Sequence, residues 1–210
     1  MGPKAIPWAA VHTWWGDDRF VPADHPLSNA RPFEDIMLEA AAWEVVHSDD
    51  RRGGVRIPAE NVHPFRTGVF LGNGRGAAAC ALALAEELTA AGLPGTDGWP
   101  VFDLILLGLG GDGHILSVFP GSAAFDSRDW ALAIPAPTHI EPHVERVTLN
   151  PAVVTVARRV LVVATGAGKA TVVAHILDGD RDPAALPGQL AVRDGATWIL
   201  DEPAAADLRR

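Results

Sequence analysis

The chain of 210 residues carries 17 Lys and Arg against 26 Asp and Glu, a formal net charge of −9, and 48% of its residues are hydrophobic. The acidic balance argues against nucleic acid and anionic membrane surfaces as partners, and the single cysteine, Cys80, excludes an internal disulfide framework and an all-cysteine metal site. The length predicts one domain, residues 1–210. Because the N-terminal MGPKAIPW has no apolar signal-like stretch, we expect a cytoplasmic protein.

One strand and two helices are predicted in the first half of the chain. A β-rich segment at 9–15 predicts a strand that ends in a polar cluster. Helical spacing of apolar residues predicts a helix over 32–46 and a second over 76–91, with Cys80 on the apolar face of the second.

Continuous apolar runs in the second half predict strands that are covered on both faces: FDLILL at 102–107 and VLVVA at 160–164. TWIL at 197–200 predicts a last strand, followed by a helical turn or two at 204–208. This alternation predicts an α/β fold of three layers, with a mainly parallel sheet and helices on both faces. Ligands bind outside the carboxyl ends of such strands, so polar clusters that follow strands are the candidate sites.

The most informative cluster is GLGGDGH at 108–114, directly after the predicted strand at 102–107. Its glycines allow a close approach of the backbone to a ligand, and they present Asp112 and His114 two residues apart. An imidazole takes a proton from water at neutral pH, while a nearby carboxylate fixes its tautomer. These residues favour a general base at His114, and a buried histidine in a tight turn is the alternative.

Residues 108–113 also fit the dinucleotide motif G-x-G-x-x-G. Pro120 leaves little room for the long helix that this motif opens, and Asp112 would put a negative charge near the pyrophosphate. We therefore expect no cofactor. His139 and His143 are four residues apart, but the intervening Pro142 prevents a helical pair of metal ligands, so we expect no metal.

Two further clusters carry cations. DDR at 17–19 supplies Arg19, whose guanidinium binds phosphate or carboxylate in a bidentate manner, with acids nearby to orient it. GAGK at 166–169 predicts a strand-to-helix turn where Lys169 adds a positive charge to a helix N-terminus. Each cluster alone could be a solvated turn, but together they suggest a small anionic ligand.

These clusters lie in segments that resemble the 6-phosphogluconolactonase family. DDRFVPADHPLSN at 17–29 is similar to the family's D-E-R-x-V-P…S-N segment. FDLILLGLGGDGHILSVFPGS at 102–122 is similar to its D-x-x-L-L-G-x-G-x-D-G-H-x-A-S-L-F-P-G signature. RVTLN at 146–150, GAGKA at 166–170 and LPGQLAV near the C-terminus match later blocks, so the resemblance extends over essentially the whole chain.

The resemblance implies a Rossmann-like fold of the sugar-phosphate isomerase type and hydrolysis of 6-phosphoglucono-δ-lactone in the oxidative pentose phosphate pathway, without a cofactor. It would make His114 the base that activates water, with Asp112 shaping the site. Substrate and phosphate contacts would come from Arg19, Lys169, Arg146, Asp17, Asn29, Gly110 and Gly111. We expect a monomer or weak homodimer, with neither nucleic acid nor membrane as a partner.

Two alternatives stay open. Glucosamine-6-phosphate deaminases share the fold but continue after the histidine with A-F-N-E-P, and here Phe119 stands in the place of the glutamate, which favours the lactonase. The family normally begins with a further segment that contains a Ser-Gly-Gly-Ser-Thr-Pro-like phosphate loop, which nothing here matches. We therefore expect a truncated chain or a weak enzyme, and a catalytically inactive sugar-phosphate-binding protein is the third possibility.

Overall fold

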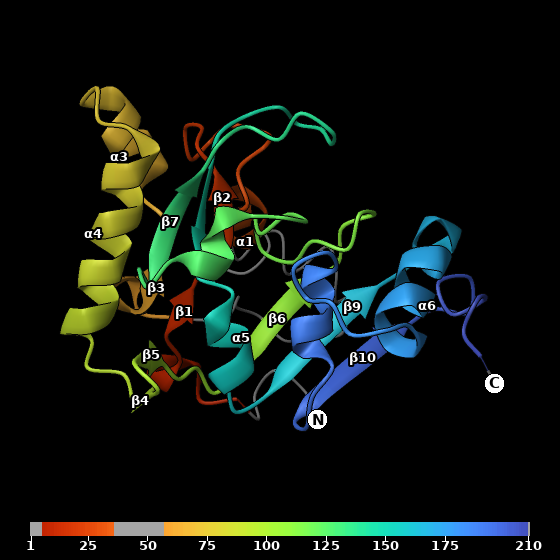
Figure 1. The fold of residues 1–210 in the computed structure, drawn as a ribbon. Helices are drawn as coiled ribbons and strands as arrows, with labels where there is room; N and C mark the ends of the chain where they lie inside the picture. The colour runs from red at the N-terminus through yellow and green to blue at the C-terminus, as the bar shows by residue number, and fades with distance from the viewer. Residues whose placement is uncertain (1–5, 36–56, 210) are drawn as a thin grey trace, which may run out of the picture.

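The computed structural model describes residues 6–35 and 57–209. Figure 1 shows a chain that contains both strands and helices, and the predicted α/β class is confirmed. Parallel strands form a two-stranded sheet, order β1-β3, and a three-stranded sheet, order β10-β9-β6. Their bounds are β1 Thr13–Trp14, β3 Val62–His63, β6 Ile105–Gly108, β9 Val160–Ala164 and β10 Ala196–Leu200.

A further sheet, which the sequence did not predict, is antiparallel. It has the order β2-β8-β7, with β2 at Asp17–Arg19, β8 at Arg146–Leu149 and β7 at Ala131–Ile134. The polar cluster DDR is therefore a strand and not the end of a strand over 9–15, a segment that the structure divides into the 3-10 helix η2 (Trp8–Ala10) and β1. A small hairpin joins β4 (Gly95–Thr96) to β5 (Trp99–Pro100).

The helix predicted over 76–91 is confirmed as α4 (Ala77–Ala90), which buries Cys80, Leu84 and Leu88 on one face. In Figure 1 it stands beside β7, and it packs against β7, β8 and α3 (Thr67–Gly72). Of the helix predicted over 32–46, the structure describes α1 (Ala30–Phe33), and residues 36–56 lie outside the described part. No described helix is long and apolar enough to cross a membrane.

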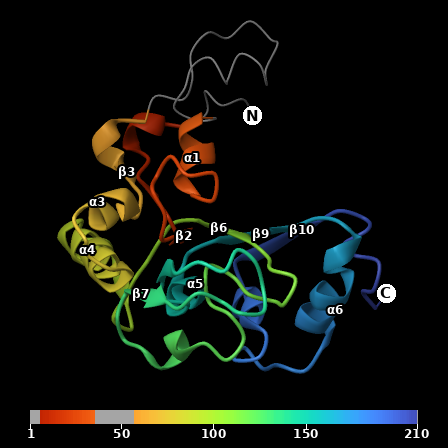
Figure 2. The ribbon, with the colours of Figure 1, turned by 90° about the horizontal axis from the view of Figure 1, so that it is seen from above.

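Helices cover only one face of the three-stranded sheet in the described part of the chain. Figure 2 shows α5 (Ala152–Val156) and α6 (Ala170–Asp178) on the same side of β6, β9 and β10. Side chains that point the other way are exposed: Leu104 by 53%, Leu106 by 67%, Val163 by 44% and Ile199 by 50%. Within the described residues, helices therefore cover one face of these strands, and an apolar run alone does not reveal which face that is.

The chain after β10 also differs from the prediction. Residues 204–208 form turns and no helix, and the side chain of Asp201 accepts the backbone N–H of Ala204 and that of Gly166. The 3-10 helices among the described residues are η2, η4 (Ala59–Asn61), η5 (Ala123–Asp126), η6 (Ala167–Lys169) and η7 (Pro187–Ala191).

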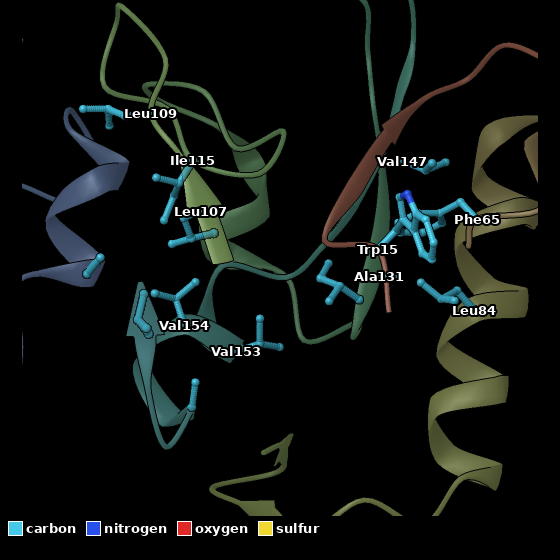
Figure 3. Packing of buried hydrophobic residues seen from close by; sticks show 14 of the residues in the cluster. Trp15, Phe65, Leu84, Leu107, Leu109, Ile115, Ala131, Val147, Val153 and Val154 are labelled. Carbon is cyan, nitrogen blue, oxygen red and sulfur yellow. The ribbon is translucent and has the colours of Figure 1, made fainter. Parts of the chain in front are cut away.

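One hydrophobic core connects the sheets and supports the loop after β6. Figure 3 shows Trp15, Phe65 and Leu84 on the α4 side and Leu107, Leu109 and Ile115 near β6. A second cluster contains Val118, Phe119, Ala124 and Ile134. Since Ile115 and Val118 are fully buried, the chain that follows the glycine-rich loop is anchored on both cores.

Candidate active site

The loop Gly108–His114 leaves the carboxyl end of β6 and folds back on itself. The backbone N–H of Gly110 donates to the carbonyl of His114 at 2.9 Å, and that of Gly113 donates to the carbonyl of Gly110 at 3.2 Å. Gly113 has a φ of +88°, which favours glycine. No helix occurs between residues 109 and 122, so the helix that a dinucleotide motif requires is missing from this described segment.

Gly110 lies directly beneath the His114 ring. A Cβ at this position would be 2.0 Å from His114 Nδ1 and 2.7 Å from Asp112 Oδ1, whereas a Cβ at Gly111 would meet nothing within 4 Å. Gly110 therefore makes room for the two side chains, and Gly111 lies in an exposed part of the loop.

Asp112 and His114 form a hydrogen-bonded pair, which we call the Asp112–His114 dyad. Oδ1 of Asp112 lies 2.5 Å from His114 Nδ1 and also accepts the backbone N–H of His114 at 3.1 Å. Because an ionised carboxylate only accepts, Nδ1 carries the proton and Nε2 keeps its lone pair. The side chains are 19% and 21% exposed, so the dyad is shielded but accessible to a small molecule.

A third side chain, His139, completes this cluster. Its Nε2 lies 2.8 Å from Oδ2 of Asp112. Burial raises the pKa of Asp112, but the hydrogen bonds from His114 and His139 outweigh burial, and the net pKa lies well below its usual range. Asp112 is therefore a carboxylate throughout the physiological pH range.

Phe119 forms an apolar wall beside the dyad. Its ring centroid lies 4.7 Å from that of His114 and 5.5 Å from that of His139, with the second pair edge to face. His143 Nδ1 lies 2.7 Å from the carbonyl of Pro137. Among the residues described, no group of three or more His, Cys, Asp or Glu could hold a metal ion.

Two arginines stand opposite each other on adjacent strands of the antiparallel sheet. In the pairing of β2 with β8, Arg19 stands opposite Arg146. Arg19 Nη1 donates to the carbonyl of Leu27 at 2.9 Å and to Asn29 Oδ1 at 3.0 Å. The buried Nε of Arg19 has no hydrogen-bond partner among the described residues.

Arg146 is almost fully buried, with an exposed fraction of 4%. Its Nε and Nη2 donate to the carbonyls of Val144 and Pro142. Burial lowers the pKa of Arg146, and the positive charge of Arg19 lowers it further. Like charges on directly opposed residues destabilise a sheet, so this arrangement favours an anion between or beside the two guanidinium groups.

Asp17 connects the arginines with the dyad. Its Oδ2 accepts the hydroxyl of Ser117 at 2.6 Å, which ties β2 to the segment that follows His114. Burial raises the pKa of Asp17, while Ser117 and the charges of Arg19, His114 and Arg146 act in the opposite direction. Each of these groups therefore lies within electrostatic reach of Asp17.

Asn29 is held in this site by a fully buried carboxylate, Asp18. Oδ1 of Asp18 accepts the backbone N–H groups of Arg19 and Asn29, both at 2.7 Å, and Oδ2 accepts the hydroxyl of Ser28. The side chain of Asn29 in turn donates to the carbonyl of Asp17. Asp18 therefore fixes the turn that presents Asn29 to Arg19.

Lys169 lies at the same edge of the sheet as the dyad, although no contact between them is recorded. β6 and β9 are parallel neighbours, so the loops after their carboxyl ends, which carry His114 and Lys169, lie next to each other. A Cβ at Gly113 would be 3.4 Å from Val172 in the first turn of α6, directly after Lys169. Within residues 6–35 and 57–209, the Lys169 ammonium group has no hydrogen-bond or ion-pair partner.

Ser117 and His139 were not predicted from the sequence as members of the site. Ser117 follows the glycine-rich loop by three residues, so its place after DGH was a signal for its position. His139 was considered only as a metal ligand together with His143. Its contact with Asp112 is non-local, and no spacing in the sequence indicates it.

A comparison with protein families matches residues 1–199 to the model described as glucosamine-6-phosphate isomerases/6-phosphogluconolactonase. The chain belongs to this family. The 6-phosphogluconolactonase of Mycobacterium tuberculosis is 36% identical over 209 residues, which cover 98% of this chain and 76% of the relative. That of Synechocystis is 32% identical and covers 100% of this chain and 78% of the relative.

Solved structures agree with this assignment. The 6-phosphogluconolactonase from Trypanosoma brucei superposes with a TM-score of 0.72 at 35% identity, covering 93% of this chain and 73% of that one. The enzyme from Trypanosoma cruzi gives a TM-score of 0.76 at 29% identity, covering 95% and 73%. A monomeric glucosamine-6-phosphate deaminase gives a TM-score of 0.70 at 16% identity, covering 97% and 78%, which reflects the shared fold alone.

Proposed function

We propose that this protein hydrolyses 6-phosphoglucono-δ-lactone to 6-phosphogluconate with water activated by His114. The observation that carries the proposal is the Asp112–His114 dyad, joined at 2.5 Å, beside Asp17, which lies within electrostatic reach of His114 and of the paired arginines Arg19 and Arg146. Relatives with up to 36% sequence identity to this chain, aligned over nearly its whole length, are 6-phosphogluconolactonases.

The dyad suits the first step of the reaction. Nε2 of His114 takes a proton from water, and the water oxygen forms a bond to the lactone carbonyl carbon as the carbonyl electron pair moves onto oxygen. The Asp112 carboxylate stabilises the imidazolium that results. The tetrahedral intermediate then breaks the ring C–O bond, and the alkoxide that leaves takes the proton back from His114. A lactone is an activated ester, so no covalent nucleophile is required.

The arginines suit the phosphate of the substrate. Arg19 Nε has no hydrogen-bond partner among the described residues, and the opposition of Arg19 to Arg146 concentrates positive charge on this sheet. Lys169 projects from the next loop at the same sheet edge, before the N-terminus of α6. We assign these three side chains to the 6-phosphate, with Asp17 and Asn29 orienting Arg19 and Gly110 and Gly111 shaping the loop.

The same site argues against a deaminase. Phe119 occupies the position of the deaminase glutamate, is 7% exposed and packs against the His114 ring at 4.7 Å. An apolar ring at this place supplies no proton for opening a sugar ring. We further propose a cytoplasmic location. We also propose a monomer or weak homodimer, and size-exclusion chromatography with light scattering tests this oligomeric state.

The decisive experiment measures lactone hydrolysis by the wild type and by His114→Ala, with the spontaneous hydrolysis subtracted. Loss of the base should lower kcat by roughly 10²- to 10⁴-fold. Circular dichroism and the melting temperature establish that the variant is folded. Near-normal turnover in a folded variant would overturn the role of His114, while release of ammonia from glucosamine 6-phosphate would indicate a deaminase. A wild type that binds 6-phosphogluconate but turns over neither substrate would be the inactive binding protein.

The phosphate assignment has its own test in Arg19→Ala and Lys169→Ala. Neither side chain takes part in bond making, so KM should rise more than kcat falls. The effect should disappear with gluconolactone, which lacks the phosphate. If both variants lost only kcat, the cations would act at the carbonyl instead.

A further inference from the structure

His139 reaches the dyad from a different part of the chain. It lies in the segment between β7 and β8, and its Nε2 is 2.8 Å from Oδ2 of Asp112. Its side chain is 49% exposed, whereas that of Asp112 is 19% exposed, so His139 covers the solvent side of the carboxylate. Its ring also meets the edge of Phe119 at 5.5 Å.

The two oxygens of Asp112 have separate partners. Oδ1 serves His114, through Nδ1 and the backbone N–H, and Oδ2 serves His139. The terminal torsion of an aspartate is broad, so a carboxylate that is held by one oxygen turns readily. A donor on the second oxygen fixes the plane of the carboxylate and therefore the direction from which Oδ1 meets His114.

The segment that carries His139 is itself held in place. His143 Nδ1 lies 2.7 Å from the carbonyl of Pro137, and Arg146 Nη2 donates to the carbonyl of Pro142 at 2.8 Å. These contacts bracket His139 and connect its segment to one of the arginines of the site. The position of His139 is thus part of a built arrangement and is not a chance contact of a free surface side chain.

We propose that His139 is a positioning residue for the lactone hydrolysis proposed above: it holds Oδ2 of Asp112 so that Oδ1 keeps the His114 proton on Nδ1 and leaves Nε2 free to accept a proton from water. This inference rests on the proposed function. An imidazolium also has an Nε2–H, so the contact persists when His139 is charged. Sequence spacing and the family resemblance assigned His139 no role of this kind.

The charged groups around His114 determine the expected pH effect. They are Asp112 on the same loop, Asp17 on β2, which interacts with His114, and Arg19 and Arg146, which act on Asp17 from β2 and β8. Removal of the His139 donor leaves the Asp112 charge less compensated, so the protonated form of His114 gains stability. The acid limb of the kcat profile should therefore move to higher pH.

The test compares His139→Ala, His139→Gln and Thr138→Ala in the complete chain. The Gln amide places a donor close to the position of Nε2, and Thr138 is the exposed neighbour in the same segment. We expect His139→Ala to lower kcat on the order of tenfold with little change in KM, as for other supporting partners of a reactive group. His139→Gln should restore most of kcat and the wild-type acid limb, and Thr138→Ala should match the wild type. In an Asp112→Ala background, His139→Ala should have no further effect.

A wild-type kcat and pH profile in His139→Ala would overturn the inference while leaving the lactonase intact. So would an equal loss in Thr138→Ala, or a failure of the Gln variant to restore activity. If the wild type itself fails to hydrolyse the lactone, the proposed function fails, and ¹⁵N spectra of the His114 ring decide the inference separately. The wild type and His139→Gln should then show one Nδ1–H tautomer and His139→Ala a mixture of tautomers, whereas identical spectra refute the positioning role.

Discussion

Replacing Gly110 by alanine tests the geometry of the dyad with a single methyl group. The new Cβ would lie 2.0 Å from Nδ1 and 2.3 Å from Cε1 of His114, and 2.7 Å from Oδ1 of Asp112. The ring must retreat by about 1 Å to restore even a 3.0 Å contact, and a misplacement of about 1 Å at a reacting group costs on the order of 10²-fold in rate. We therefore expect kcat for lactone hydrolysis to fall at least 10²-fold in Gly110→Ala.

Gly72→Ala, at the end of α3 and outside the site, is the control, since its Cβ would meet nothing within 4 Å and neither Gly72 nor Gly110 has a positive φ. This variant should retain wild-type kcat and KM. The Gly110→Ala variant should lose about 1–3 kcal/mol of stability at most, as overpacked sites do, which separates the rate effect from unfolding. Calorimetry and the background-corrected lactone assay measure both quantities. Equal activity in the two variants would refute the assigned position of the His114 ring.

Two further predictions concern stability. The pKa of folded Asp112 is depressed below the unfolded value of 3.8, so its carboxylate stabilises the fold above that pH and the contribution is lost as the pH falls. Asp112→Asn should therefore have a lower free energy of unfolding than the wild type at about pH 5, and the difference should shrink by about pH 3. Denaturant titrations at both pH values measure it. On α4, Leu88 is 0% exposed and Leu82 is 57% exposed, so Leu88→Ala should cost about 2–5 kcal/mol and Leu82→Ala about 0.5 kcal/mol or less by thermal unfolding.

Local signals in the sequence predicted the features that depend on neighbouring residues. The apolar spacing of 76–91 predicted α4, because a regular helix repeats its buried face every three or four residues. The glycines between β6 and His114 predicted a tight loop that presents Asp112 and His114, and the structure brings these two side chains into contact. In both cases, the residues that interact are close together in the chain.

Features that depend on distant segments could not be predicted in this way. β2 has three residues, too few for a period of two to be visible, and its strand character comes from pairing with β8. The contact of His139 with Asp112 likewise crosses between segments. FDLILL was predicted to be covered on both faces, but Leu106 is 67% exposed while Leu107 is 4% exposed, since hydrophobicity alone does not specify what packs on a strand.

The paired arginines show why the site has to be explained by function and not by stability. Arg19 and Arg146 stand opposite each other on adjacent strands, an arrangement that destabilises a sheet. Arg19 also keeps a buried Nε without a partner among the described residues, and an unsatisfied buried donor costs about 1–3 kcal/mol. The carboxylates of Asp17 and Asp18 reduce the repulsion, because both favour the charged form of Arg146. An anionic ligand would supply the missing acceptor and more negative charge. Relief of the unsatisfied donor and of the repulsion between the arginines would then contribute to the free energy of binding a phosphate.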